Sequence, residues 1–299
     1  MVAGAVRLIV FFAFAVCAGA AAAAEEVRRV SANGAEFAYV EAGRGDPVVL
    51  VHGGLQDHRF WTELLPLFAQ RFRTIAYSRR NHFPNPTGAD GVPDGAGDIH
   101  GEDLAALITA LDLGRVHVVA HSSGAVAALF FAANHPRAVR ALALNEPPAA
   151  GLIAGTPEGQ AVVREFAAGQ VTAREAFRAR DFERAVRLFV DGVGGPGTFD
   201  RRSEADRRMA LDNALAHLAD TISPRPRAPF GCEAAGRITT PTLLTNGERS
   251  PAFFHRIADA LGRCLPRSER ATIPGASHTV PGEAPRPYGE AVMAFLARH

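Results

Sequence analysis

The amino-acid sequence predicts an α/β fold, in which a doubly wound, mostly parallel sheet carries an N-terminal antiparallel hairpin and a helical insertion. Three observations predict this fold. Strand-like and helix-like stretches alternate between residues 47 and 144, which is typical of parallel strands joined by crossover helices. Asn33-Gly34 separates two short strand patterns, as in a hairpin. Charged helical patterns interrupt the alternation between residues 147 and 229, after which it resumes.

Composition and charge exclude several classes of protein. Apolar residues make up 47% of the 299 residues and charged residues 21%, as in ordinary globular chains. A disordered, collagen-like or multi-span membrane protein is therefore excluded. The 32 Lys and Arg side chains nearly balance the 31 Asp and Glu side chains, so the net charge favours neither nucleic acid nor an anionic membrane as a partner. We expect a small-molecule substrate and make no prediction of the oligomeric state.

The first 24 residues are predicted to be a secretory signal peptide. Arg7 precedes a short apolar run, Leu8–Val16, and the segment ends in Ala21–Ala24 before Glu25. The alternative is a membrane anchor, for which this run is too short. We therefore expect cleavage near Ala24, no stable membrane span afterwards, and a periplasmic or secreted mature protein.

If the protein is exported, its two remaining cysteines, Cys232 and Cys264, reach an oxidising compartment. Disulfides persist in oxidising compartments outside the cytosol. Each cysteine precedes a predicted strand, over Pro241–Asn246 and Glu269–Ile273. If these strands are parallel neighbours, both cysteines lie near the same edge of the sheet, within bonding reach. We expect a disulfide, with two buried free thiols as the alternative.

The elements before the insertion follow from apolar patterning and turn residues. Pro47–Val51 is apolar throughout, as in a strand buried on both faces, and residues 104–111 repeat leucine and isoleucine at helical spacing. Proline and glycine mark Asn81–Gly97 as a loop. We expect strands over Arg28–Ser31, Glu36–Val40, Pro47–Val51, Arg73–Ser78, Arg115–Ala120 and Val139–Leu144, and helices over Trp61–Phe68, residues 104–111 and Ser123–Asn134.

The insertion, residues 147–229, is expected to cover the C-terminal edge of the sheet. It contains helical patterns over Glu175–Val190 and Ser203–Ala219, with a glycine-rich break at Gly192–Gly197. The alternation then resumes with a strand ending at Asn246, a helix over Ala252–Leu261, a strand ending at Ile273 and a helix over Tyr288–Arg298. Residues 25–146 and 230–299 are thus expected to form the core domain.

The first residues that indicate chemistry lie in the turn Ala120-His121-Ser122-Ser123-Gly124. A buried strand enters a helix there through a small-x-Ser-x-Gly turn, whose strained central residue requires small residues two positions away on both sides. Such a turn presents the Ser122 hydroxyl at the edge of the sheet where these folds bind ligands. The Ser123 N–H, at a helix N-terminus, can bind developing negative charge. A serine-rich helix cap is the alternative, but the flanking strand and helix favour a nucleophile.

With this turn, the sequence resembles the α/β-hydrolase superfamily over nearly all of residues 30–299, and the insertion resembles the lid of that family. Ala120 stands where glycine is commonest, and alanine is small enough for the turn to form. The resemblance implies a second oxyanion donor after the first apolar strand, which maps to the backbone N–H of Gly54 in His52-Gly53-Gly54. We expect His52 to hold this turn by hydrogen bonding.

The resemblance also implies that the base lies in the loop after the last strand. His278 follows Pro274-Gly275-Ala276-Ser277 at that place, and the order of nucleophile before histidine agrees with the family. Of the 11 histidines, His278 is therefore the one expected to accept the Ser122 proton.

The acid is where the sequence departs from the family pattern. The usual Asp aligns with Ser250, which carries no charge to stabilise an imidazolium. Glu146 directly follows the strand after the nucleophile helix, where some family members carry their acid, and Glu248 lies two residues before Ser250. We predict Glu146 as the acid, on the same edge as Ser122 and His278, and keep Glu248 as the alternative.

These residues together predict a carboxylesterase-like serine hydrolase that forms an acyl-enzyme and cleaves small, largely neutral esters or lactones. No metal or other cofactor is expected, because no Cys/His cluster has zinc spacing. Two alternatives stay open: a C–C bond hydrolase of the ring-cleavage or β-diketone type, and a catalytically silent binding protein with the hydrolase fold. The sequence suggests His58, Trp61, Arg79 and Arg80 as substrate-binding residues, with core, surface or ion-pair positions as the alternative.

Overall fold

The computed structural model describes residues 26–86, 97–222 and 229–299. The predicted signal peptide, residues 1–24, lies outside the described residues. Within the described ranges, no helix is both long enough and apolar enough to cross a membrane.

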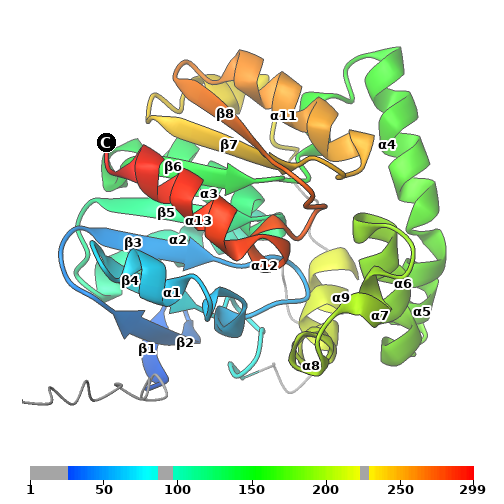
Figure 1. The fold of residues 1–299 in the computed structure, drawn as a ribbon, viewed down its shortest axis with the longest axis horizontal. Helices are drawn as coiled ribbons and strands as arrows, with labels where there is room; N and C mark the ends of the chain where they lie inside the picture. The colour runs from blue at the N-terminus through cyan, green and yellow to red at the C-terminus, as the bar shows by residue number, and fades with distance from the viewer. Residues whose placement is uncertain (1–25, 87–96, 223–228) are drawn as a thin grey trace, which may run out of the picture.

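An eight-stranded sheet organises the chain, in the order β1-β2-β4-β3-β5-β6-β7-β8 (Figure 1). The antiparallel hairpin β1–β2 joins the sheet through β2 and β4, and every later pair of neighbours is parallel. The predicted doubly wound, mostly parallel sheet with an N-terminal hairpin is therefore confirmed. The strands are β1 Arg28–Ala32, β2 Ala35–Ala42, β3 Pro47–Val51, β4 Arg73–Tyr77, β5 Val116–His121, β6 Val139–Asn145, β7 Thr242–Gly247 and β8 Ser268–Ile273.

Two apolar layers cover the sheet, one on each face. Alternate residues of β5 take part in different layers: Val118 and Ala120 pack with α2, α3 and α11, whereas Val119 packs with α1, α12 and α13. In Figure 1, α1 and α13 lie in front of the strands. Alternate residues of a central strand face opposite layers, and both layers are apolar. Consecutive positions of such a strand are therefore mostly apolar. The helices are α1 Leu65–Phe68, α2 Gly97–Ala110, α3 Ser123–Asn134, α11 Ala252–Cys264, α12 Val280–Glu283 and α13 Pro285–Leu296.

The insertion between β6 and β7 forms a separate layer at one end of the sheet, at the right of Figure 1. Its helices build an apolar cluster of their own, and Leu55 from the loop after β3 packs into that cluster. The α-helices of this segment are α4 Pro157–Gly169, α5 Val171–Arg178, α6 Phe182–Gly194, α7 Thr198–Arg201, α8 Glu204–Asp212 and α9 Ala214–Ile222.

Several expected helices differ in extent from the observed ones. The stretch expected as one helix over Glu175–Val190 is split, because Arg180 has a positive φ and the Asp181 side chain caps α6 by accepting from Arg184 N. The stretch over Ser203–Ala219 is split at Asn213, whose side chain bonds to Asp57. The stretch over Trp61–Phe68 is also divided, into a 3₁₀ turn, His58–Trp61, and α1.

Cys232 and Cys264 are joined by a disulfide in the structure, with their Cα atoms 5.2 Å apart. Cys232 begins the short helix α10, Cys232–Gly236, and Cys264 ends α11. Cys232 precedes β7 and Cys264 precedes β8 along the chain, and these two strands are parallel neighbours, as the argument from the sheet edge assumes.

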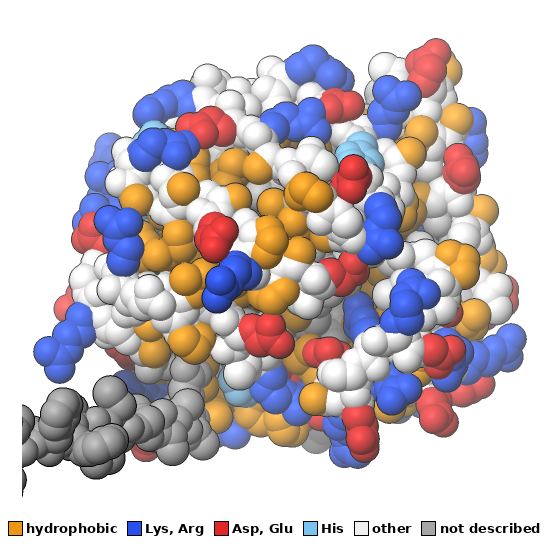
Figure 2. Space-filling model, viewed as in Figure 1, with side chains coloured by type: hydrophobic (Ala, Val, Ile, Leu, Met, Phe, Trp, Pro, Cys, Tyr) orange, Lys and Arg blue, Asp and Glu red, His pale blue; other side chains and the backbone are white. Residues whose placement is uncertain are grey.

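The exposed surface carries both signs of charge. Figure 2 shows basic and acidic side chains interspersed over the face that carries α1 and α13. This even distribution agrees with the balanced composition of 32 basic and 31 acidic side chains.

Candidate active site

Ser122 occupies the strained turn between β5 and α3. Its φ of 54° and ψ of −125° lie in a region that non-glycine residues rarely adopt. Close packing holds the turn, because a Cβ on Gly124 would lie 2.2 Å from the backbone oxygen of His52. The Ser122 N–H donates to the carbonyl of Asn145 at 2.8 Å, which ties the turn to the end of β6.

His278 lies in the loop between β8 and α12, beside the Ser122 hydroxyl. Its Nε2 is 3.0 Å from Ser122 Oγ and its Nδ1 is 2.7 Å from Glu146 Oε2. The imidazole is 4% exposed and stacks on the Phe254 ring at 4.0 Å between centroids. Burial lowers the pKa of His278, and the positive charge of Arg202 lowers it further. The imidazole is therefore neutral near pH 7, which is the form that can accept a proton.

Glu146 is held from both sides at the end of β6. Its Oε1 accepts from the Gly247 N–H at 2.9 Å and from Asn246 Nδ2 at 3.2 Å, which leaves Oε2 facing His278. Burial raises the pKa of Glu146, and these two hydrogen bonds oppose that rise. The residue has a positive φ of 48°, so the strand ends in a second strained position.

The structure brings Glu146, and not Glu248, to the histidine. Glu248 is exposed and its Oε2 accepts from the Gly275 N–H at 2.9 Å. Ser250, at the position of the family's usual acid, is buried and carries no charge. Among the described residues, Glu146 is thus the carboxylate in contact with His278.

The two predicted oxyanion donors, Gly54 and Ser123, line the same cavity as Ser122 and His278. Neither backbone N–H has an acceptor within the described chain, so both are available to a ligand. His52 fixes the preceding turn, since its Nδ1 lies 2.8 Å from the Gly53 oxygen and its Nε2 accepts from the Arg79 N–H at 2.9 Å. A pair of such N–H groups aimed at one point can stabilise a tetrahedral oxyanion.

The four residues suggested as substrate ligands do not line this cavity. Trp61 is fully buried in the apolar layer beneath α13, and His58 contacts Ser78 Oγ at 2.9 Å. Arg80 is paired with Asp103, and Arg79 is paired with Asp220 and also donates to the Gly53 carbonyl. Packing or ion pairing engages each of the four, while Arg79 also donates to Ser123 Oγ at 3.1 Å and lines a neighbouring cavity with it, so a substrate-binding role for them stays a prediction.

The cavity around Ser122, called here the Ser122 cavity, has a volume of about 360 Å³. Its walls come mostly from the insertion, and local sequence patterns do not indicate which helical residues face it. His217 of α9 lies between the rings of Phe177 and Phe189, at 4.9 and 4.3 Å between centroids. The wall also includes Phe166, Gln170, Arg174, Arg178, Asp220 and Phe254.

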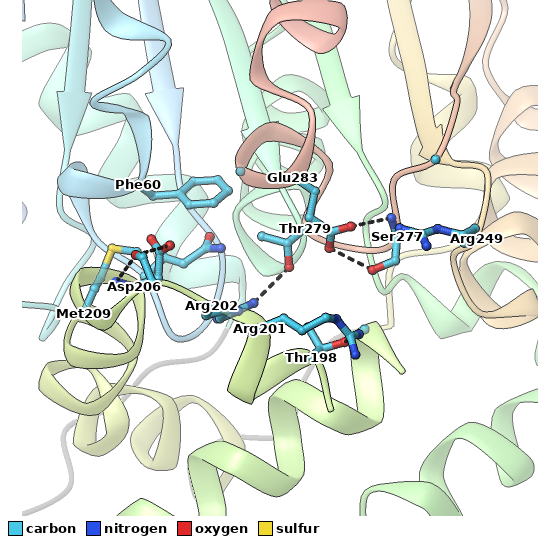
Figure 3. A pocket seen from close by; sticks show the side chains of 15 residues that line it. Phe60, Thr198, Arg201, Arg202, Asp206, Met209, Arg249, Ser277, Thr279 and Glu283 are labelled. Carbon is cyan, nitrogen blue, oxygen red and sulfur yellow. Dashed lines mark hydrogen bonds between the residues drawn. The ribbon is translucent and has the colours of Figure 1, made fainter. Parts of the chain in front are cut away.

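A second cavity of about 460 Å³ lies on the other side of the His278 loop, against α7 and α8 (Figure 3). Two residues of its wall are linked, since Arg202 donates to Thr279 Oγ1 at 3.0 Å, as the dashed line in Figure 3 marks. In the described part of the chain, no carboxylate lies within 4.0 Å of the Arg202 guanidinium. Glu283, on the same wall, is instead engaged by the backbone and hydroxyl of Ser277.

Metal ligation is not evident in the described ranges, where no group of three or more His, Cys, Asp or Glu side chains could hold an ion. The Ser122 hydroxyl, the His278 imidazole and two N–H groups without acceptors among the described residues line one cavity, and the buried Glu146 carboxylate lies behind the imidazole. This set is suited to acyl transfer.

Comparisons with known proteins agree with this fold. A family model described as alpha/beta hydrolase fold matches residues 46–285. The chain is 28% identical over 263 residues to a dihydrolipoyllysine-residue acetyltransferase component of the acetoin cleaving system of Pseudomonas putida; the match covers 85% of this chain and 64% of that protein. It is 25% identical to the 2-hydroxy-6-oxo-6-(2'-aminophenyl)hexa-2,4-dienoic acid hydrolase of Metapseudomonas resinovorans, with 91% of each covered. A thermophilic esterase from Thermogutta terrifontis has the same fold, with a TM-score of 0.73, 21% identity, and coverage of 91% of this chain and 98% of that one.

Proposed function

The chain belongs to the α/β-hydrolase family, and from this premise we propose that it is a serine hydrolase that cleaves small, largely neutral esters or lactones. The observation that carries the proposal is the continuous chain of hydrogen bonds from Ser122 Oγ through His278 to Glu146, at 3.0 and 2.7 Å. The aromatic walls of the Ser122 cavity favour an uncharged substrate, because burying a charge against them would be costly.

The proposed reaction proceeds through an acyl-enzyme. Ser122 Oγ attacks the substrate carbonyl while His278 Nε2 takes its proton, and the Gly54 and Ser123 N–H groups bind the oxyanion. When the intermediate collapses, the C–O bond to the alcohol breaks and His278 protonates that alcohol. Water, deprotonated by His278, then attacks the acyl-enzyme and releases the acid, which regenerates the Ser122 hydroxyl.

Glu146 is proposed to orient and stabilise His278 in this cycle. With Glu146 ionised, its Oε2 accepts from the Nδ1–H of His278, so the lone pair of Nε2 faces Ser122. The carboxylate also stabilises the imidazolium that forms in both halves of the reaction.

Labelling of Ser122 tests the proposal directly. Mature protein is treated with a fluorophosphonate, and hydrolysis of 4-nitrophenyl esters of graded chain length is measured, with Ser122→Ala as the control. We expect labelling and turnover in the natural protein and loss of both in Ser122→Ala. An unlabelled protein without turnover would favour the catalytically silent alternative.

A C–C bond hydrolase is the second candidate, and Arg202 is the observation that favours it. Its guanidinium lacks a carboxylate partner in the described chain, and a ring-cleavage substrate carries a carboxylate; because Arg202 lines the second cavity, such a substrate must extend past the His278 loop to reach it. The Metapseudomonas relative is named for a dienoic acid of this kind. Turnover of a dienoic acid that exceeds ester turnover, and that falls selectively in Arg202→Gln, would establish this candidate instead.

We also propose that the protein is exported, with its signal peptide cleaved near Ala24, and that residues 147–229 act as a lid over the core formed by residues 25–146 and 230–299. The disulfide between Cys232 and Cys264 supports an oxidising destination, periplasmic or extracellular. N-terminal sequencing of the exported protein tests the cleavage site, and a mature chain that begins at Met1 would contradict it.

A further inference from the structure

One polar side chain in the wall of the Ser122 cavity has no partner. Gln170 lies at the junction of α4 and α5 and is 3% exposed. Among the described residues, neither its Nε2 nor its Oε1 has a hydrogen-bond partner. A buried amide left in this state costs free energy on folding, so its presence calls for an explanation.

Packing alone does not explain this amide. Its nitrogen lies in a notch of α6 that exists only because residue 192 is glycine: a Cβ on Gly192 would lie 2.2 Å from Nε2. A leucine or methionine would fill the same notch without burying an unpaired polar group. Asn213, another buried amide, is satisfied by bonds to Asp57 and to the Phe83 N–H. Asn81 Nδ2 and Asn246 Oδ1 are single amide atoms left without a partner among the described residues, whereas at Gln170 both amide atoms lack one.

The chemistry of the side chain specifies the group that would pair with it. A primary amide offers a donor and an acceptor side by side, so its complement is a group that offers an acceptor and a donor, such as another amide. The aromatic rings of Phe166, Phe177 and Phe189 on the same wall favour an uncharged group. The charged wall residues are either exposed, as are Arg174 and Arg178, or paired, as is Asp220.

We propose that Gln170 binds an amide in the acyl part of the substrate, so that the protein selects esters or lactones whose acyl group carries an amide. The inference rests on the proposed function, because the acyl group enters this cavity with its carbonyl at Ser122. Gln170 would then set specificity, and the pairing missing in the free protein would be supplied by the substrate. A site built to hydrogen-bond a polar group discriminates strongly against an analogue that lacks it.

Two esters of equal size test this role. One is 4-nitrophenyl 5-amino-5-oxopentanoate, whose terminal primary amide offers an acceptor and a donor side by side, and the other is 4-nitrophenyl 5-methylhexanoate, in which methyl groups replace the amide oxygen and nitrogen. The readout is the ratio of kcat/KM for the amide ester to kcat/KM for the alkyl ester, because a general loss of activity cancels in that ratio. The variants are Gln170→Leu and, should that variant fold poorly, Gln170→Met. The matched control is Gln160→Leu, a glutamine of α4 that is exposed and bonds to the Ala154 carbonyl.

We expect the ratio to fall by about tenfold or more in Gln170→Leu and to stay within about twofold in Gln160→Leu. A ratio unchanged in both Gln170 variants would overturn the inference and leave the serine hydrolase standing. A natural protein that is not labelled at Ser122 and cleaves neither ester would instead overturn the proposed function, and the inference with it.

A binding measurement separates recognition from turnover. In Ser122→Ala, the amide ester should raise the thermal unfolding midpoint more than the alkyl ester does, and adding Gln170→Leu should remove this difference. Equal shifts for the two esters in Ser122→Ala would count against an amide-binding role for Gln170.

Discussion

Replacement of Glu146 by glutamine tests the assignment of the acid most sharply. Glu146 Oε1 accepts from Gly247 N–H and Asn246 Nδ2, so the oxygen of a glutamine is held there and its NH₂ group faces His278. Nδ1 of His278 must then accept, which places the proton on Nε2, opposite Ser122 Oγ. The variant therefore loses both the negative charge and the tautomer that the reaction needs.

The distances give the size of the expected loss. Two unit charges separated by the 2.7 Å between Glu146 Oε2 and His278 Nδ1 interact by at most ~6 kcal/mol at an effective dielectric constant of about 20. That upper limit corresponds to a factor somewhat above ~10⁴, and removing the carboxylate of a comparable triad costs about 10⁴ in kcat. We therefore expect kcat of Glu146→Gln to fall between about 10²- and 10⁴-fold.

Glu248→Gln is the matched control, because it makes the same chemical change on an exposed side chain. Among the described residues, that carboxylate accepts from the Gly275 N–H, away from His278, so we expect kcat to fall by less than about threefold. Both variants are assayed on one 4-nitrophenyl ester, with unfolding curves to verify that each is folded. A loss in Glu146→Gln that is less than about tenfold larger than the loss in Glu248→Gln would refute this assignment.

Three further predictions concern charge, cross-linking and pH. Arg202→Gln should raise the pKa of His278 by removing a positive charge, so the acid limb of the kcat/KM profile should move to higher pH; a shift to lower pH would contradict this. Replacing both Cys232 and Cys264 by serine removes a cross-link across 32 residues, which should lower the free energy of unfolding by about 3–4 kcal/mol in urea titrations; an unchanged midpoint would show that the cross-link does not stabilise the fold. Burial lowers the pKa of His52, His82, His117, His121 and His278. The unfolded chain therefore binds more protons below about pH 6.5, and the urea midpoint should fall as the pH decreases from about 7.5 to 5; a midpoint that rises would reverse the sign of this argument.

The sheet and its turn could be predicted because local patterns determine them. Apolar runs, the Asn33-Gly34 hairpin signal and the small residues around Ser122 each act over a few positions, and the structure follows them. Glu146 could be named as a candidate because a residue that directly follows a parallel strand lies at the same edge as Ser122.

The insertion was harder to predict because contacts between distant segments determine its helix ends. Asn213 ends α8 while its side chain bonds to Asp57 and the Phe83 N–H, partners more than a hundred residues away. Helix α4 was missed, although Thr156-Pro157 is a cap and a first-turn proline. Gln170 could not be singled out, because whether a buried amide finds a partner depends on how the folded chain surrounds it.

Through the packing of Leu55, the insertion also holds the loop after β3 in place, besides forming most of the walls of the Ser122 cavity. This leucine directly follows Gly54 and lies in the apolar cluster built by the insertion's own helices. The Gly54 N–H, which is proposed to donate to the oxyanion, therefore directly precedes a residue that packs in the insertion and not in the sheet. Shortening these helices to admit larger substrates would remove the packing of Leu55 and release the loop that carries the Gly54 N–H. We expect such a variant to lose catalytic rate instead of accepting a wider set of substrates.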